Sequence, residues 1–120
     1  PLACSPRLND LFVENIKEYF PETKIEEAGH FTASTDMGDI SHLMPSIHPF
    51  IGGVDGGLHT KDFCVTDFDA AAILPGKVFA MNIIDLLYDE AAMAKEILEK
   101  EKPILTKEEY LAKLESYFQS

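Results

Sequence analysis

The chain has 120 residues, the size of one ordinary domain and too short for two sizeable cores. Hydrophobic residues make up 46% and charged residues 26%, a balance that indicates a globular protein and excludes a disordered or fibrous one. The 21 Asp and Glu residues outnumber the 10 Lys and Arg residues, giving a net charge of −11. Because so acidic a surface repels phosphate, we expect neither nucleic acid nor an anionic membrane as a partner.

The sequence predicts no membrane span and a cytoplasmic location. The longest strongly apolar stretch, Phe68–Leu74, is far shorter than the ~20 residues that a bilayer requires. Two cysteines, Cys4 and Cys64, do not make a disulfide framework, so a reducing compartment is expected. The chain opens on Pro1 without an initiator Met, and we therefore expect a processed product or a piece of a longer protein.

The first predicted helix covers Ser5–Phe20. Ser5 is a suitable N-cap, Pro6 suits the first helical position, and Pro21 ends the pattern. The apolar residues recur at helical spacing and predict a buried stripe made of Leu8, Leu11, Phe12, Ile16, Tyr19 and Phe20.

Short strands are predicted in the middle of the chain, at Lys24–Ile25, His30–Ser34 and Ser46–Ile51. Turn-forming residues separate them, in Asp36–Asp39 and in the glycine-rich stretch Gly52–Gly57. Irregular backbone rich in Gly, His and Asp often carries a functional site on a rigid scaffold. This region is therefore the first place to look for one.

A long helix is predicted after Asp67, with Asp67 or Asp69 as its N-cap. Pro75 and Gly76 interrupt the pattern, so a late start or a kink is expected there. The apolar positions predict a wide buried face, made of Ile73, Ala80, Ile83, Ile84, Leu87 and Tyr88.

Two further helical segments follow. Ala91–Glu101 is an amphipathic continuation that Pro103 ends, and Thr106 with Glu109 forms a capping box that begins a last helix. Its apolar face comprises Leu111, Leu114 and Phe118. The whole pattern predicts an α/β fold, with helices packed on a few strands. So small a sheet leaves much of the long helix without an obvious partner.

Most of the histidines favour structural roles. Glu26 and Glu27 before His30 have no helical spacing that would place them on one face, so a solvated charge pair is the better interpretation. His42 has no partner at a metal-ligand spacing, and Pro49 holds His48 in an extended segment where packing is expected.

His59 is the exception among the histidines. It follows a glycine-rich loop that allows close approach of the backbone to a ligand, and neutral imidazole is a common ligand of zinc. One histidine never makes a site by itself, so the spacing alone does not establish a metal centre.

Three segments together resemble the C-terminal part of the dinuclear-metal amidohydrolases. These segments are Ala33–Ser41, with its Ser-Thr-Asp-Met-Gly-Asp-Ile-Ser run, then Met44–Pro49, then Leu58–Phe63, with its His-Thr-Lys-Asp-Phe run. The group contains aminobenzoyl-glutamate hydrolases, indole-acetyl-amino-acid hydrolases, aminoacylases and dipeptidases. The resemblance extends over roughly Leu2–Tyr88 and implies a part of a zinc-peptidase-like catalytic domain, in which residues 1–120 form a single piece.

The resemblance implies two divalent metal ions, zinc first, with manganese or cobalt as alternatives, and hydrolysis of the amide bond of an N-acyl amino acid or dipeptide. It makes His59 the last metal ligand and places Asp36 as support close to the metal centre. Gly56 and Gly57 would lie near the carboxylate end of the substrate. It also implies a homodimer formed through a lid domain.

The sequence departs from the family in what it lacks. No His is followed two residues later by Asp, the general-base glutamate pair is missing, and so is the lid domain. We therefore expect no catalytic residue in this chain and no activity from the chain alone. Two alternatives stay open: a non-catalytic acidic interaction module, and one half of a split hydrolase.

Overall fold

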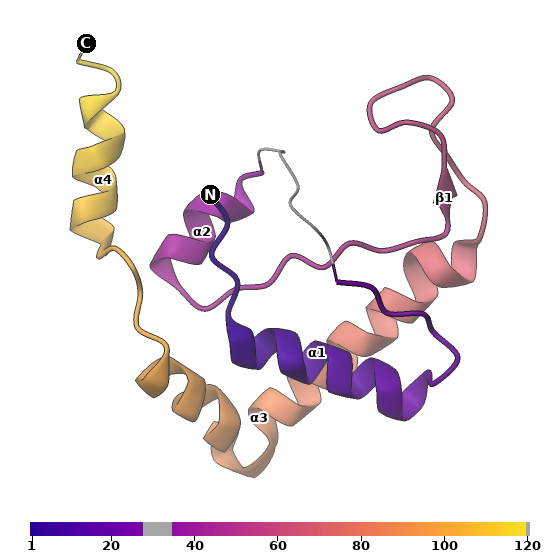
Figure 1. The fold of residues 1–120 in the computed structure, drawn as a ribbon. Coiled ribbons are helices and arrows are strands. Elements are labelled where there is room, and N and C mark those ends of the chain that lie inside the picture. Colours follow the sequence, from indigo (N-terminus) through magenta and orange to yellow (C-terminus); the bar gives the residue numbers. More distant parts are fainter. Residues whose placement is uncertain (28–34, 120) are drawn as a thin grey trace.

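The computed structural model describes residues 1–27 and 35–119 and is mostly helical (Figure 1). In chain order the elements are α1 (Pro6–Tyr19), α2 (Met37–Leu43), β1 (Val54–Asp55), β2 (Cys64–Val65), the π-helical turn η1 (Asp69–Ile73), α3 (Leu74–Lys100) and α4 (Lys107–Ser116). The two strands pair antiparallel, with Val54 opposite Val65 and Asp55 opposite Cys64. They are the two arms of a hairpin at the N-terminal end of α3 (Figure 1).

The predicted α/β fold is wrong. Helix accounts for 57% of the described residues, and their one sheet has two strands of two residues each. Lys24–Ile25 and Ser46–Ile51 are irregular, and His30–Ser34 lies outside the described residues. Lys24–Ile25 is too short to form a sheet, and Pro49 removes a backbone donor from the middle of Ser46–Ile51. No layer of helices on strands results.

The core lies where α1 crosses α3. Phe12, Ile16 and Val78 are almost completely buried, and the rings of Phe12 and Phe79 lie 5.4 Å apart. The predicted helix start is confirmed, because the Ser5 side chain accepts a hydrogen bond from the backbone N–H of Leu8 at 3.1 Å. The predicted capping box is likewise present at the start of α4.

The contact between α1 and α3 also contains polar groups. The side-chain amide of Asn15 donates hydrogen bonds to Asn82 Oδ1 and to Asp85 Oδ2, each at 2.8 Å. Asn15 and Asn82 are both buried, with exposed fractions of 5%. Since buried polar groups are costly unless they are paired, this network fixes how the two helices sit against each other.

The long helix bends at residues 88–91 rather than at Pro75. Asp89, Glu90 and Ala91 have φ values of 49°, 53° and 61°, in the left-handed region that favours glycine. The segment after the bend runs back beside the start of α1, where Ile97 is buried and Glu101 accepts a hydrogen bond from the Arg7 backbone N–H. Pro75 is accommodated without a kink because it stands at the start of α3, after η1.

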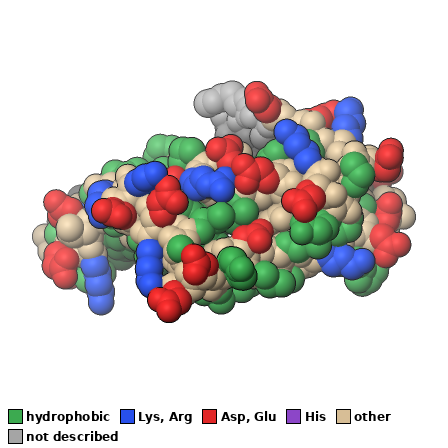
Figure 2. Space-filling view, turned by 90° about the horizontal axis from the view of Figure 1, so that it is seen from below, with side chains coloured by type: hydrophobic (Ala, Val, Ile, Leu, Met, Phe, Trp, Pro, Cys, Tyr) green, Lys and Arg blue, Asp and Glu red, His purple; other side chains and the backbone are tan. Residues whose placement is uncertain are grey.

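The wide apolar face of α3 is exposed, contrary to the prediction. Ile83, Ile84 and Leu87 have exposed fractions of 56%, 64% and 63%, whereas the residues that α3 buries before the bend are Pro75, Val78 and Asn82. The radius of gyration is 17.0 Å, against about 14 Å for a compact domain of this length. The chain is therefore an open assembly with much unpartnered apolar surface, some of which is seen as green areas in Figure 2.

By length and composition alone, one helix in the described part of the chain could cross a membrane. It comprises Asp69–Lys100, and its apolar window has a mean hydropathy of 1.6. The prediction from Phe68–Leu74 overlooked it because Pro75, Gly76 and Lys77 interrupt an otherwise apolar segment. One such helix is weak evidence for a span, since core helices of soluble proteins share these properties.

Candidate functional site

The loop that carries His59 is the turn of the β1–β2 hairpin. Short hydrogen bonds close it: the Asp55 carboxylate accepts from the Gly56 backbone N–H at 2.7 Å, and the Gly57 carbonyl accepts from the Thr60 hydroxyl at 2.8 Å. At its base, the Gly53 carbonyl accepts from the backbone N–H of Thr66 at 2.9 Å. The loop is thus a defined turn that projects from the helices (Figure 1).

Gly56 is required by the geometry of this turn. Its φ is +85°, and a Cβ at this position would lie 2.4 Å from the backbone oxygen of Asp62. No side chain fits so close an approach, and the conformation itself disfavours any L-residue. Gly57 has a looser environment, because a Cβ added there would lie 3.1 Å from the Thr60 methyl group. The glycines therefore set the shape of the loop.

His59 lies on the outer part of the loop and is exposed. Its φ of 61° is uncommon for a residue with a Cβ, although His adopts this left-handed conformation more readily than most residues. The imidazole forms no hydrogen bond with any described residue, so both ring nitrogens are open to a ligand. By contrast, His42 bonds the Gly38 carbonyl through Nδ1 at 2.6 Å, which agrees with the structural role expected for it.

The structure does not bring Asp36 to His59. Asp36 immediately precedes α2, which lies apart from the hairpin, on the side of the molecule toward α4 (Figure 1). Residues 36–39 were predicted as a turn, yet Met37–Leu43 is helical. The hydroxyl of Ser41, on α2, accepts a hydrogen bond from the Ala3 backbone N–H at 3.0 Å, and this contact helps to hold the short helix in place.

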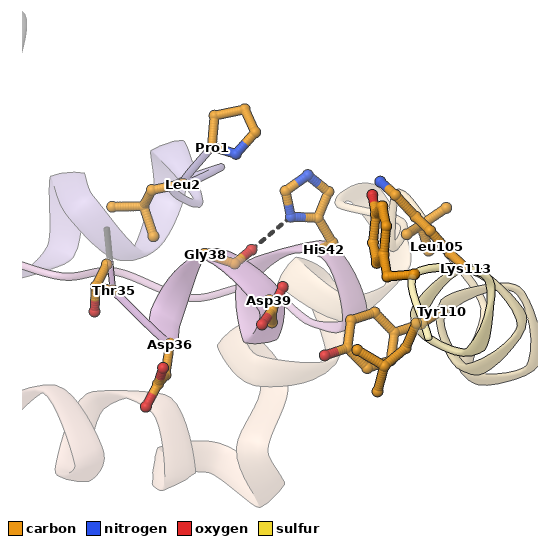
Figure 3. Close-up of a pocket in the computed structure, with 12 residues that line it drawn as sticks. Pro1, Leu2, Thr35, Asp36, Gly38, Asp39, His42, Leu105, Tyr110 and Lys113 are labelled. Atoms are coloured by element: carbon orange, nitrogen blue, oxygen red, sulfur yellow. Dashed lines mark hydrogen bonds between the residues drawn. The ribbon is translucent and has the colours of Figure 1, made fainter. Parts of the chain in front are cut away.

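Asp36 instead lines a groove between α2 and α4. The cavity has a volume of about 390 Å³ and brings together charged and polar side chains that are distant in the sequence (Figure 3). Its polar lining includes Asp36, Asp39, His42, Tyr110 and Lys113. Partial burial raises the pKa of Tyr110, and the negative charge of Asp39 and a hydrogen bond to it raise that pKa further.

Asp39, Tyr110 and Lys113 were not predicted as site residues. Tyr110 and Lys113 belong to a helix whose sequence shows only a capping box and an amphipathic face, and nothing in it indicates that α4 approaches α2. Opposite charges in an open groove make a polar surface, and no group of three metal-ligating side chains occurs there among the described residues.

The described residues do not by themselves fit the metal centre that the resemblance implies. Zinc is held by three or four protein ligands, and no cluster of three His, Cys, Asp or Glu side chains occurs in residues 1–27 and 35–119. His59 therefore does not have two further ligands of these types beside it among the described residues. A metal that it binds would need at least one more ligand from elsewhere.

No protein-family model, curated protein or solved structure matches this chain.

Proposed function

We propose that this chain contributes one metal-ligating histidine, His59, to a metal-dependent amidohydrolase that cleaves N-acyl amino acids or dipeptides. The observation that carries the proposal is the presentation of His59: an exposed imidazole on a tight glycine turn, without a hydrogen bond to any described residue, within the His-Thr-Lys-Asp-Phe run that resembles the family. The other ligands and the general base come from polypeptide outside this chain. Zinc is the first candidate metal, with manganese or cobalt as alternatives.

The open surface of the chain supports the proposal that it is one part of a larger catalytic unit. Among the described residues five hydrophobic side chains are buried, while 22 large ones are exposed. Native single domains cover such residues, and extensive apolar exposure marks an interaction site. A catalytic unit completed by further polypeptide accounts for this surface and for the missing ligands together.

The direct test uses the full-length gene product. We expect His59→Ala to lose about one metal ion per subunit and to lower kcat by at least roughly 100-fold, because removing one essential group costs orders of magnitude in rate. His48→Ala is the matched control, since His48 is half-buried and packs beside Phe50 with ring centres 5.6 Å apart. The control should keep its metal and lose at most some stability.

A second measurement uses the 120-residue chain alone. With added zinc, manganese or cobalt it should not hydrolyse N-acetyl amino acids. Chelator-sensitive activity that follows the purified chain through chromatography would show a complete site here and overturn the proposal. Retention of all metal and of normal turnover in full-length His59→Ala would also overturn it. A full-length protein without metal would instead favour the non-catalytic interaction module.

A further inference from the structure

The exposed side of α3 has the composition of an interface rather than of a solvated surface. Six exposed residues at helical spacings define what we term the outer stripe: Ile73, the last residue of η1, and Gly76, Ala80, Ile83, Ile84 and Leu87 of α3. All six are exposed, and none is polar. Residues spaced three and four apart form one continuous seam along a helix, here about 21 Å long.

The surface shape of the outer stripe suits close packing against another element. Gly76 has open space around it, with no heavy atom within 4 Å of a Cβ built there, and Ala80 is also small and exposed. The larger Ile83, Ile84 and Leu87 follow one and two turns later. Small residues beside large ones produce a depression next to a ridge, the shape into which apolar side chains of another element interlock.

The charges around the outer stripe distinguish between possible occupants. Three acids near the ends of the stripe, Asp69, Asp89 and Glu90, outnumber the one base of segment 69–90, Lys77, whereas Asp85 faces α1 and accepts a hydrogen bond from Asn15. If two copies paired in parallel, Asp89 and Glu90 would face their own equivalents. If they paired antiparallel, these acids would face Asp69 of the other copy. The net charge of −11 adds general repulsion, so a second copy is the wrong occupant.

We infer that the outer stripe docks another polypeptide that presents apolar side chains flanked by Lys or Arg. This inference rests on the proposed function in one respect: it assigns to that polypeptide the remaining metal ligands. The hairpin with His59 lies at the N-terminal end of α3 (Figure 1), so a partner seated along the stripe reaches the loop. Exposed Phe68 and Val65, at 67% and 55%, continue the apolar surface in that direction.

The test uses two synthetic amphipathic helical peptides of about 15 residues, the length of the stripe. Both carry the same leucine face, flanked by Lys in one peptide and by Glu in the other. Fluorescence anisotropy with the 120-residue chain, without metal, should show the Lys peptide binding roughly tenfold or more tightly than the Glu peptide, with an affinity that falls as salt is raised.

Two substitutions locate the binding. Ile84→Asp should weaken the Lys peptide roughly tenfold or more, because it places a charge in the centre of an apolar contact. Leu98→Asp is the matched control: Leu98 has a similar exposed fraction, 59% against 64%, but lies beyond the bend. Far-UV circular dichroism establishes that both variants keep their helices. The double substitution Asp89→Lys and Glu90→Lys should shift the preference toward the Glu peptide.

Several outcomes would overturn the inference: equal affinity for the two peptides, no binding of either, equal effects of both aspartate variants, or a concentration-dependent dimer in sedimentation that Ile84→Asp abolishes. The last result would make a second copy the occupant. Because the peptide experiment contains no metal, its failure is separate from the failure of the proposed function, which the metal content of full-length His59→Ala reports.

Discussion

Asn15 offers the sharpest test of how α1 and α3 are held together. Its side-chain amide donates both hydrogen bonds of the buried network, to Asn82 Oδ1 and to Asp85 Oδ2. Asn15→Ala removes both donors and leaves the acceptors facing a gap that is closed to water on the Asn82 side. The three side chains act together, so the loss falls on the whole contact between the helices.

The magnitude follows from the two bonds. A hydrogen bond to a neutral acceptor contributes about 1 kcal/mol and one to a charged acceptor about 1.5–3 kcal/mol, and the half-buried Asp85 belongs at the lower end. Alanine returns about 0.7 kcal/mol through its better helix propensity. The expected net destabilisation is therefore about 2 kcal/mol, or roughly 8 °C in Tm for a chain of this size.

Asn9→Ala is the matched control, since Asn9 lies on the same helix and is exposed. Asn9→Ala gains the same helix propensity without losing a buried hydrogen bond, so this substitution should be neutral or slightly stabilising. Urea unfolding followed by circular dichroism gives both free energies of unfolding. If Asn15→Ala unfolds within about 0.5 kcal/mol of Asn9→Ala, the usual range of neutral surface substitutions, the network does not hold the helices as the structure indicates.

Three further predictions concern the bend, the last helix and the hairpin. Ala91→Gly should stabilise the chain by about 1 kcal/mol because it relieves a left-handed φ of 61°. Ala92→Gly lies one residue into regular helix and should destabilise the chain by a similar amount. If urea unfolding shows that both substitutions change the free energy of unfolding in the same direction, the bend is not where the structure places it. Thr106→Ala should cost about 1 kcal/mol of α4 stability. The backbone N–H of Thr106 hydrogen-bonds the Glu109 carboxylate and, with the Thr106 side chain, lowers the pKa of Glu109. The stability that this interaction gives α4 should be lost as the pH falls through the range in which glutamate protonates, and a circular dichroism titration that Glu109→Gln leaves unchanged would contradict this. Gly56→Ala should remove amide-exchange protection from the hairpin and leave that of α1 unchanged, since its Cβ would lie 2.4 Å from the backbone oxygen of Asp62.

Local signals in the sequence predicted the starts of α1 and α4 correctly. Ser5 and Thr106 each act through a bond to the backbone N–H three residues further on, so the relevant contacts lie within the sequence window itself. The helix α2 was missed because Asp36–Asp39 consists of turn formers, and contacts such as that between Ala3 and Ser41 span 38 residues. The hairpin was missed because strands of two residues have no periodicity to detect.

In the candidate site, too, the local features could be predicted from the sequence and the long-range ones could not. The glycine-rich turn and the accessible His59 follow from local conformational preferences, and sequence reasoning identified both. The separation of Asp36 from that loop depends on where α2 lies, which no local pattern encodes. The groove of Asp39, Tyr110 and Lys113 arises from an approach of two helices about 70 residues apart in the chain, and it was not predictable for that reason.

The covered and exposed sides of α3 give the physical link between fold and function. Periodicity correctly grouped Ile83, Ile84 and Leu87 on one face, but it does not say which face a chain covers. The structure buries Val78 and Asn82 against α1 and leaves Ile83 and Ile84 in water, whereas a helix of a finished domain covers its widest apolar face. The side that faces α1 is covered within the chain, and its polar groups are hydrogen-bonded there, whereas the outer apolar side gains nothing until another surface removes it from water. The chain therefore covers only one side of α3, and the outer stripe needs a surface from another polypeptide to cover it.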